Sequence, residues 1–119
     1  MKGTINELVN ICHEASVKAG WYNDLETGKP SFNKGEKMML IVSEIAEAFE
    51  GERKNLMDDH LPHRRMPEVE LADAVIRIAD YCGAMGYDLG GAIVEKLQYN
   101  ENRPDHKIEN RLKENGKKY

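Results

Sequence analysis

The sequence has few cysteines, few prolines and no long apolar run. Its two cysteines, Cys12 and Cys82, form no CxxC motif and lie within apolar helical patterns, which excludes a disulfide scaffold and predicts two buried free thiols. No stretch approaches the roughly 18 uninterrupted apolar residues that a membrane span needs. The N-terminal segment also lacks the basic-then-apolar pattern of a signal peptide. We therefore expect a cytoplasmic protein without membrane contact.

Several motifs that carry chemistry are also absent. Neither Gly28-Lys29 nor Gly116-Lys117 completes the GxxxxGK[ST] pattern, so there is no phosphate-binding P-loop. No ExxH pair is present, which counts against a di-iron carboxylate bundle. Basic residues do not predominate: 17 Lys and Arg against 21 Asp and Glu give a net charge of −4. Such a protein is a poor electrostatic partner for a nucleic acid polymer, and we expect none.

Helical periodicity is the main signal that the sequence does contain. Apolar residues recur at intervals of three and four in four segments, approximately 5–19, 34–54, 67–84 and 89–103. Thr4 and Asp88 are the expected N-caps, and Gly20 and Pro104 are expected to end helices. No segment alternates as a strand does. We predict an all-α fold, a four-helix bundle in a single domain over residues 1–119, with a polar tail over 105–119 whose order depends on a partner or ligand.

The apolar positions define the helical faces that we expect to be buried. In the second segment they are Met38, Ile41, Val42, Ile45, Ala46 and Phe49. In the third segment they are Leu71, Ala74, Val75, Ile78, Ala79 and Cys82. Four helices of these lengths form a thin bundle, and small units of this kind often complete their core by self-association.

Four acidic residues flank these apolar faces. Glu44 and Glu47 are three residues apart in the second segment, and Glu70 and Asp73 are three apart in the third. Each pair shares a helical face, so antiparallel packing of the two helices brings four carboxylates together. Their repulsion is most simply relieved by Mg²⁺ or Mn²⁺, whose remaining ligands are water and phosphate oxygens. The alternative is an ordinary solvated flank, and spacing alone does not decide between the two.

The segments around these acids carry a family resemblance. They are LIVSEIAEAFE (40–50), MDDHLPHR (57–64) and ELADAVIR (70–77). With the ExxE and ExxD pairs, they resemble the compact MazG-like branch of the all-α nucleoside triphosphate pyrophosphohydrolases, over roughly residues 5–119. Many relatives carry a Glu-Glu doublet where this chain has Ser43-Glu44, which leaves the number of metal ions open. Glu50 is either a compensating ligand or a surface acid.

A basic stripe in the fourth segment is the candidate phosphate contact. Lys96, Asn100 and Arg103 share one face and offer a point charge, a neutral donor and a planar fork, although basic stripes often only solvate a helix. Their surroundings, EKLQYNENRP (95–104), are similar to the part of the MazG-like family thought to contact nucleotide. Trp21 is a candidate for stacking on the base, the alternative being an anchor of the core.

The resemblance implies a Mg²⁺-dependent hydrolase that cleaves a (d)NTP between the α and β phosphorus, giving (d)NMP and pyrophosphate. Glu44, Glu47, Glu70 and Asp73 would hold the metal, and Glu47 would orient or deprotonate the attacking water. The resemblance also implies a homodimer or homotetramer. Two other interpretations stay open: a helical interaction module without enzymatic activity, and an enzyme of the same fold that acts on an alarmone or a non-standard nucleotide.

Overall fold

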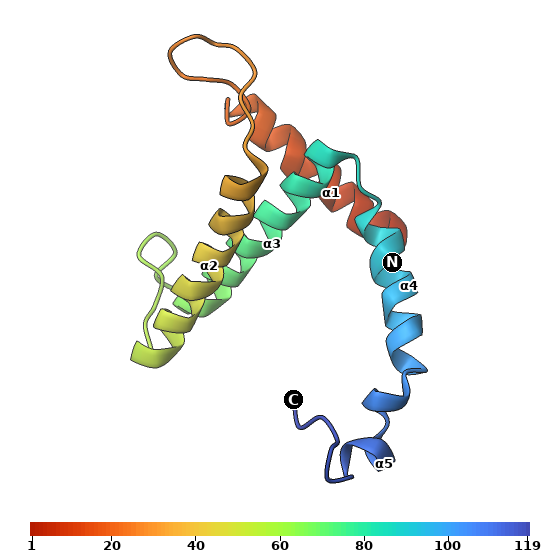
Figure 1. The fold of residues 1–119 in the computed structure, drawn as a ribbon. Helices are drawn as coiled ribbons and strands as arrows, with labels where there is room; N and C mark the ends of the chain where they lie inside the picture. Colours follow the sequence, from red (N-terminus) through yellow and green to blue (C-terminus); the bar gives the residue numbers. More distant parts are fainter. The chain divides into compact units, whose positions relative to one another are not determined.

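The computed structural model describes residues 1–119 and contains helices, turns and two isolated backbone bridges (Figure 1). The long helices are α1 (Lys2–Lys18), α2 (Lys34–Lys54), α3 (Met66–Met85) and α4 (Leu89–Glu101). A 3₁₀ turn, η1 (Pro104–His106), and a short helix, α5 (Ile108–Arg111), follow. The all-α prediction is confirmed. None of the helices combines the length and the apolar character that crossing a membrane requires.

The chain divides into two compact units. One unit consists of Glu7–Tyr87 and contains most of α1 together with α2 and α3. The other consists of Met1–Asn6 and Asp88–Tyr119, and it contains α4 and the C-terminal turns.

Most helix ends lie where the sequence predicts them. The side chain of Asn33 accepts a hydrogen bond from the backbone N–H of Glu36 at 2.9 Å and starts α2. Asp88 caps α4 in the same way, and Gly86 ends α3 with a φ of 69°, a left-handed conformation that favours glycine. The predicted cap at Thr4 is wrong, because α1 already begins at Lys2.

The fourth helix is shorter than predicted. It ends at Glu101, and Arg103 is extended with a ψ of 128°. A residue that precedes a proline disfavours the helical conformation, and Pro104 therefore stops the helix before Arg103. Beyond it the chain forms η1 and α5, and the ammonium of Lys118 donates to the backbone carbonyl of Arg111 at 2.9 Å.

Helices α2 and α3 form an antiparallel hairpin and lie side by side (Figure 1). Their shared seam consists of small buried residues, chiefly Ala48 and Gly51 from α2 and Ala74 from α3. In the connecting loop, the buried carboxylate of Asp58 accepts hydrogen bonds from the backbone N–H groups of His60 and Leu61 at 2.9 and 2.8 Å. These bonds hold the loop next to the acidic end of the hairpin.

The predicted buried face of α2 is wrong for its largest side chains. Val42 is 51% exposed, Ile45 49% and Phe49 65%, and in α3 Leu71 and Val75 are each 50% exposed. The reason is that α2 meets α3 through small residues rather than through its wide apolar row. At 100° per residue, that row lies on the side of the hairpin away from the carboxylates of Glu44, Glu47 and Glu70.

Helix α1 contributes Val9 and Cys12 to the core of the first unit. Cys82 of α3 is also buried, and both cysteines are free thiols, as predicted. Burial raises the pKa of each thiol, so neither is an activated nucleophile.

Candidate metal centre

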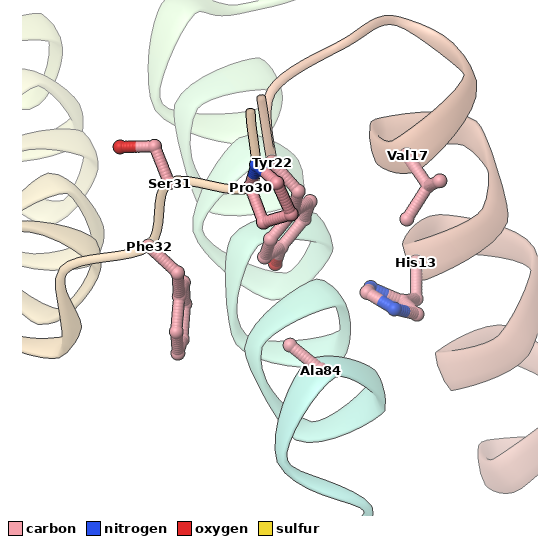
Figure 2. Close-up of a pocket in the computed structure, with 7 residues that line it drawn as sticks. All are labelled: His13, Val17, Tyr22, Pro30, Ser31, Phe32 and Ala84. Atoms are coloured by element: carbon pink, nitrogen blue, oxygen red, sulfur yellow. The ribbon is translucent and has the colours of Figure 1, made fainter. Parts of the chain in front are cut away.

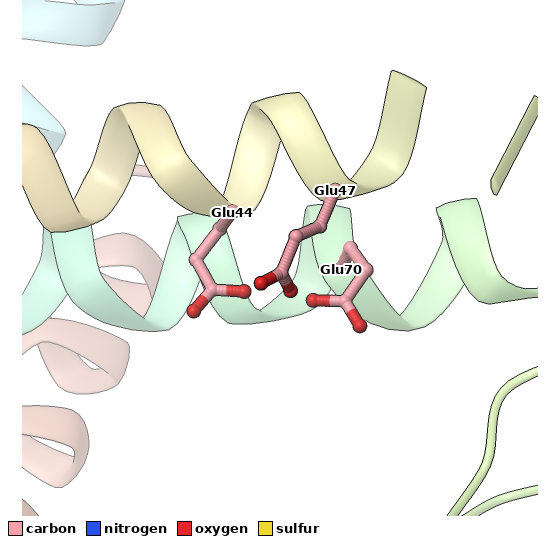
Figure 3. A group of neighbouring side chains, drawn as sticks. All are labelled: Glu44, Glu47 and Glu70. Atoms are coloured by element: carbon pink, nitrogen blue, oxygen red, sulfur yellow. The ribbon is translucent and has the colours of Figure 1, made fainter. Parts of the chain in front are cut away.

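Three carboxylates from α2 and α3 converge at the edge of the hairpin (Figure 3). One oxygen from each of Glu44, Glu47 and Glu70 can be chosen so that all three lie within 4.8 Å of one another. Glu44 is buried, Glu70 is partly buried and Glu47 is exposed. The helical spacing of three places Glu44 and Glu47 on one face of α2, and the antiparallel register places Glu70 opposite them.

Asp73, the fourth predicted acid, does not join this group. It lies one turn beyond Glu70 on α3. Burial raises the pKa of Asp73, and the nearby carboxylate of Glu44 adds to the increase. The charge of Glu44 therefore affects the pKa of Asp73, although the carboxylate of Asp73 lies outside the group of three.

Like charges dominate the electrostatics of the centre. The pKa of Glu70 is raised to about 8, first by burial and then by hydrogen bonding to Glu44 and Glu47, whose charges add to the effect. A single basic side chain compensates: Nε of Arg77 contacts Oε1 of Glu44 at 3.1 Å. Glu70 thus holds a proton near neutral pH, in a place where a cation would relieve the same repulsion.

The donor set fits a small divalent cation. Carboxylate oxygens are hard ligands, and oxygens on opposite sides of one Mg²⁺ lie about 4.2 Å apart. Oxygens within 4.8 Å of one another reach such an ion with a small adjustment of flexible glutamate side chains. Three carboxylates leave coordination positions for water and for the oxygens of a phosphate ligand.

The predicted phosphate contacts lie in the other unit, where Arg103 and Lys96 already have partners. Arg103 binds Asp105 through two hydrogen bonds of 3.0 and 2.6 Å, and Lys117 lies 3.5 Å from the same carboxylate. Lys96 lies over the ring of Tyr99, with 4.5 Å between its ammonium and the ring centroid. Because α4 ends at Glu101, Arg103 follows the helix instead of belonging to it.

Asn100 differs from its neighbours in the stripe. Its side-chain oxygen is buried and has no hydrogen-bond partner. Buried amide oxygens are normally paired, so this one is an acceptor that needs a donor.

Trp21 is 71% exposed, so the alternative interpretation of this residue as a core anchor is wrong. It lies in the loop after α1 and is free to meet a ligand. Its neighbour Tyr22 is the aromatic residue of this loop that turns inward, because its hydroxyl donates to Asp80 at 2.8 Å.

Two polar residues, Asp80 and His13, were not identified from the sequence. Asp80 is only 7% exposed, and Nδ1 of His13 lies 3.0 Å from its Oδ1. A signal was present for Asp80: it follows Asp73 by seven residues and therefore continues the same helical stripe. No signal singled out His13, because its partner lies 67 residues away in the chain.

Comparison of the chain with protein-family models, with curated proteins and with solved structures finds no match.

Proposed function

We propose that this protein is a Mg²⁺-dependent nucleoside triphosphate pyrophosphohydrolase that cleaves a (d)NTP to (d)NMP and pyrophosphate. The observation that supports it most is the convergence of Glu44, Glu47 and Glu70 on one centre. The sequence resemblance to the MazG-like pyrophosphohydrolases supports the same activity. Mn²⁺ is an alternative ion with the same ligand preferences.

The residues divide into two roles. Glu44, Glu47 and Glu70 hold the ion, with Asp73 at its border, and Glu47, the exposed member, orients or deprotonates the attacking water. When bound, Mg²⁺ neutralises the triphosphate and lowers the pKa of a coordinated water. Lys96, Asn100 and Arg103 contact the phosphates, and the unpaired oxygen of Asn100 accepts a hydrogen bond from a sugar hydroxyl or an ordered water. Trp21 stacks on the base or covers it.

The decisive experiment is incubation with a panel of (d)NTPs and Mg²⁺, with separate assays for pyrophosphate and orthophosphate. Pyrophosphate release that stops on addition of EDTA supports the proposal. Orthophosphate release in its place contradicts cleavage between the α and β phosphorus. If no nucleotide in the panel is cleaved, the same assay with an alarmone or a non-standard nucleotide tests the related activity.

The exposed apolar row of α2 supports self-association. Met38, Val42, Ile45 and Phe49 follow the alternating spacing of four and three that packs helix against helix, and each is between 46% and 65% exposed. A two-fold axis lets the same row on a second copy cover this one. We propose a homodimer, or a homotetramer built from it, that completes the four-helix bundle. A non-enzymatic interaction module would use the same row to bind a different protein.

A further inference from the structure

Arg77 of α3 is the basic side chain at the carboxylate group, and most of its hydrogen-bond donors are unused. Its Nε donates to Oε1 of Glu44 at 3.1 Å. Its terminal nitrogens, Nη1 and Nη2, carry the remaining N–H groups and donate to no atom of the protein. The side chain of Arg77 is 40% exposed, whereas that of Glu44 is 12% exposed. The guanidinium is therefore held at one edge and open to a ligand along the other.

A guanidinium held in this way suits a phosphate group. Nη1 and Nη2 can donate two parallel hydrogen bonds to two oxygens of one phosphate, and arginine carries a permanent positive charge. The bond from Nε to Glu44 orients the planar group in advance, so less conformational freedom is lost when a phosphate binds. Arg77 thus offers a phosphate contact directly beside the carboxylates.

The order of the carboxylates places Arg77 on one side of the centre. Figure 3 shows the carboxylate of Glu44 at one end of the group, with those of Glu47 and Glu70 beyond it. Arg77 contacts Glu44 and therefore lies at that end, whereas Glu47 is the residue proposed to orient the attacking water. In an in-line displacement the attacking and leaving oxygens lie on opposite sides of the phosphorus. Arg77 is therefore on the side that suits the leaving group.

The other polar cluster of this unit does not supply such a contact. There the carboxylate of Asp80 pairs with His13 at 3.0 Å and with Lys37 at 4.0 Å. A cavity of about 360 Å³ opens beside His13 and Ala84 (Figure 2). Ala84 follows Glu70 by fourteen residues on α3, which is about 21 Å along the helix axis. The cavity is thus too far from the carboxylates to hold a phosphate bound there, and Lys37 is already paired.

We propose that Nη1 and Nη2 of Arg77 bind the β-phosphate of the nucleotide and stabilise the leaving pyrophosphate. The inference rests on the proposed function and adds a catalytic residue to it. The oxygen of water forms a bond to the α-phosphorus, and one proton of the water passes to Glu47. The bond from the α-phosphorus to the bridging oxygen breaks, and its electron pair stays on the pyrophosphate. Because negative charge grows on the pyrophosphate as this bond breaks, a cation beside it lowers the barrier.

The kinetic test compares the wild type with Arg77→Gln, Arg77→Ala and Arg77→Lys on a (d)NTP that the wild type cleaves. We expect Arg77→Gln and Arg77→Ala to lose about 100-fold in kcat, the usual effect of removing a donor to developing charge. Arg77→Lys keeps the charge without the fork and should lose about tenfold. Added guanidinium ion should raise kcat of Arg77→Ala by about tenfold, the effect of one charge-assisted hydrogen bond, and leave the wild type unchanged.

A binding measurement gives a readout apart from turnover. In isothermal titration calorimetry with Mg²⁺ present, inorganic pyrophosphate should bind Arg77→Gln about tenfold more weakly than the wild type. Mg²⁺ alone should bind Arg77→Gln at least as tightly, because a positive charge beside Glu44 has been removed. If pyrophosphate affinity is unchanged, or if guanidinium does not rescue Arg77→Ala, Arg77 only balances the charge of Glu44, and the phosphate contact is wrong.

Two controls accompany these variants. Arg53, which pairs with Glu50 at 3.0 Å on the same hairpin, is exposed, so Arg53→Gln should keep the wild-type kcat and pyrophosphate affinity. An equal loss in Arg53→Gln would overturn the inference, because any lost positive charge would then have the same effect. Circular dichroism checks folding. If loss of the partner of buried Glu44 unfolds Arg77→Gln, the calorimetry is decided by Arg77→Lys, which keeps a cation there.

The outcomes separate this inference from the proposed function. If the wild type cleaves nucleotides and the Arg77 variants keep the wild-type kcat and pyrophosphate affinity, the role of Arg77 is wrong and the activity stands. If the wild type neither cleaves a nucleotide nor binds pyrophosphate with Mg²⁺, the proposed function fails, and this inference fails with it.

Discussion

The α2–α3 hairpin and the segment from α4 to the C-terminus both carry stripes of charge, but they balance this charge differently. In the hairpin, three carboxylates meet, and Arg77 is the single basic side chain paired with them. In the C-terminal segment, Asp105 binds both Arg103 and Lys117, and the hydrogen bond from Arg103 lowers the pKa of Asp105 to about 2. One region has a surplus of like charge, and the other is internally neutralised.

This difference indicates which region is better suited to bind a cation. A surplus of negative charge is relieved by an external cation, whereas a neutralised pair binds a ligand only by exchanging partners. The hairpin therefore carries the stronger evidence of function. For the proposed phosphate contact at Arg103 to form, phosphate must displace Asp105.

The substitution Glu47→Gln tests the role of the carboxylate group, and we expect it to have the largest effect. The substitution keeps the size of the side chain and removes its charge and its capacity to accept a proton. We expect kcat to fall by at least about 100-fold, with the helical circular dichroism signal unchanged because Glu47 is exposed. Glu52→Gln, at an exposed position later in the same helix, is the matched control. Retained turnover in Glu47→Gln would refute the assigned role.

The apolar side of the hairpin is tested by Val42→Glu. If a second copy covers this row, the substitution buries an unpaired charge at the interface and weakens association by at least about tenfold. Light scattering coupled to size-exclusion chromatography measures the change. Leu25→Asp, in a loop where Leu25 is 98% exposed, should leave the oligomer intact. A wild-type protein that is monomeric at all concentrations contradicts the interface itself.

The neutralised region is tested with a pair of substitutions. Arg103→Ala removes the guanidinium fork, and we expect KM for the nucleotide to rise by about tenfold. Asp105→Asn releases Arg103 from its partner and should lower KM by about threefold, since the exchange no longer opposes binding. Steady-state kinetics measures both. Equal KM values in the wild type and both variants would show that Arg103 does not contact the substrate.

The smallest predicted effect is a pH dependence of stability. Glu70 has its pKa raised from 4.5 to about 8 in the folded protein, so the folded state binds more protons than the unfolded state between these values. Stability without metal therefore falls as the pH rises through this window. We expect the melting temperature in EDTA to decrease between about pH 5 and about pH 8 in the wild type, and to decrease less in Glu70→Gln. Equal decreases in both proteins would contradict the shared proton.

Helix locations followed from the sequence because their signals are local. Asn33 caps α2 through a bond to a residue three positions on, and Pro67 starts α3 in its first turn. The convergence of Glu44, Glu47 and Glu70 was also predictable, since helical spacing and antiparallel pairing were enough. Asp73 fell outside the group because its position depends on the rotation of α3, which spacing does not determine.

Other features depended on contacts between distant residues. The predicted burial of Val42 and Phe49 was wrong because the hairpin packs through Ala48 and Ala74, and no periodicity ranks a small apolar residue above a large one. The pairing of His13 with Asp80 joins residues 67 apart. The ion pair of Arg103 with Asp105 was missed because Pro104 ends the helix early and turns the chain.

The seam of Ala48, Gly51 and Ala74 has a consequence for how the acidic centre can be altered. Only methyl groups and backbone separate the two helices at this seam. The distance between Glu70 and Glu44 is therefore set by small residues outside the carboxylate group. A bulkier side chain at Ala74 would push the helices apart and separate the carboxylates without replacing any of them. If the proposed ion binds here, its selectivity depends on the small residues between the helices as well as on the carboxylates.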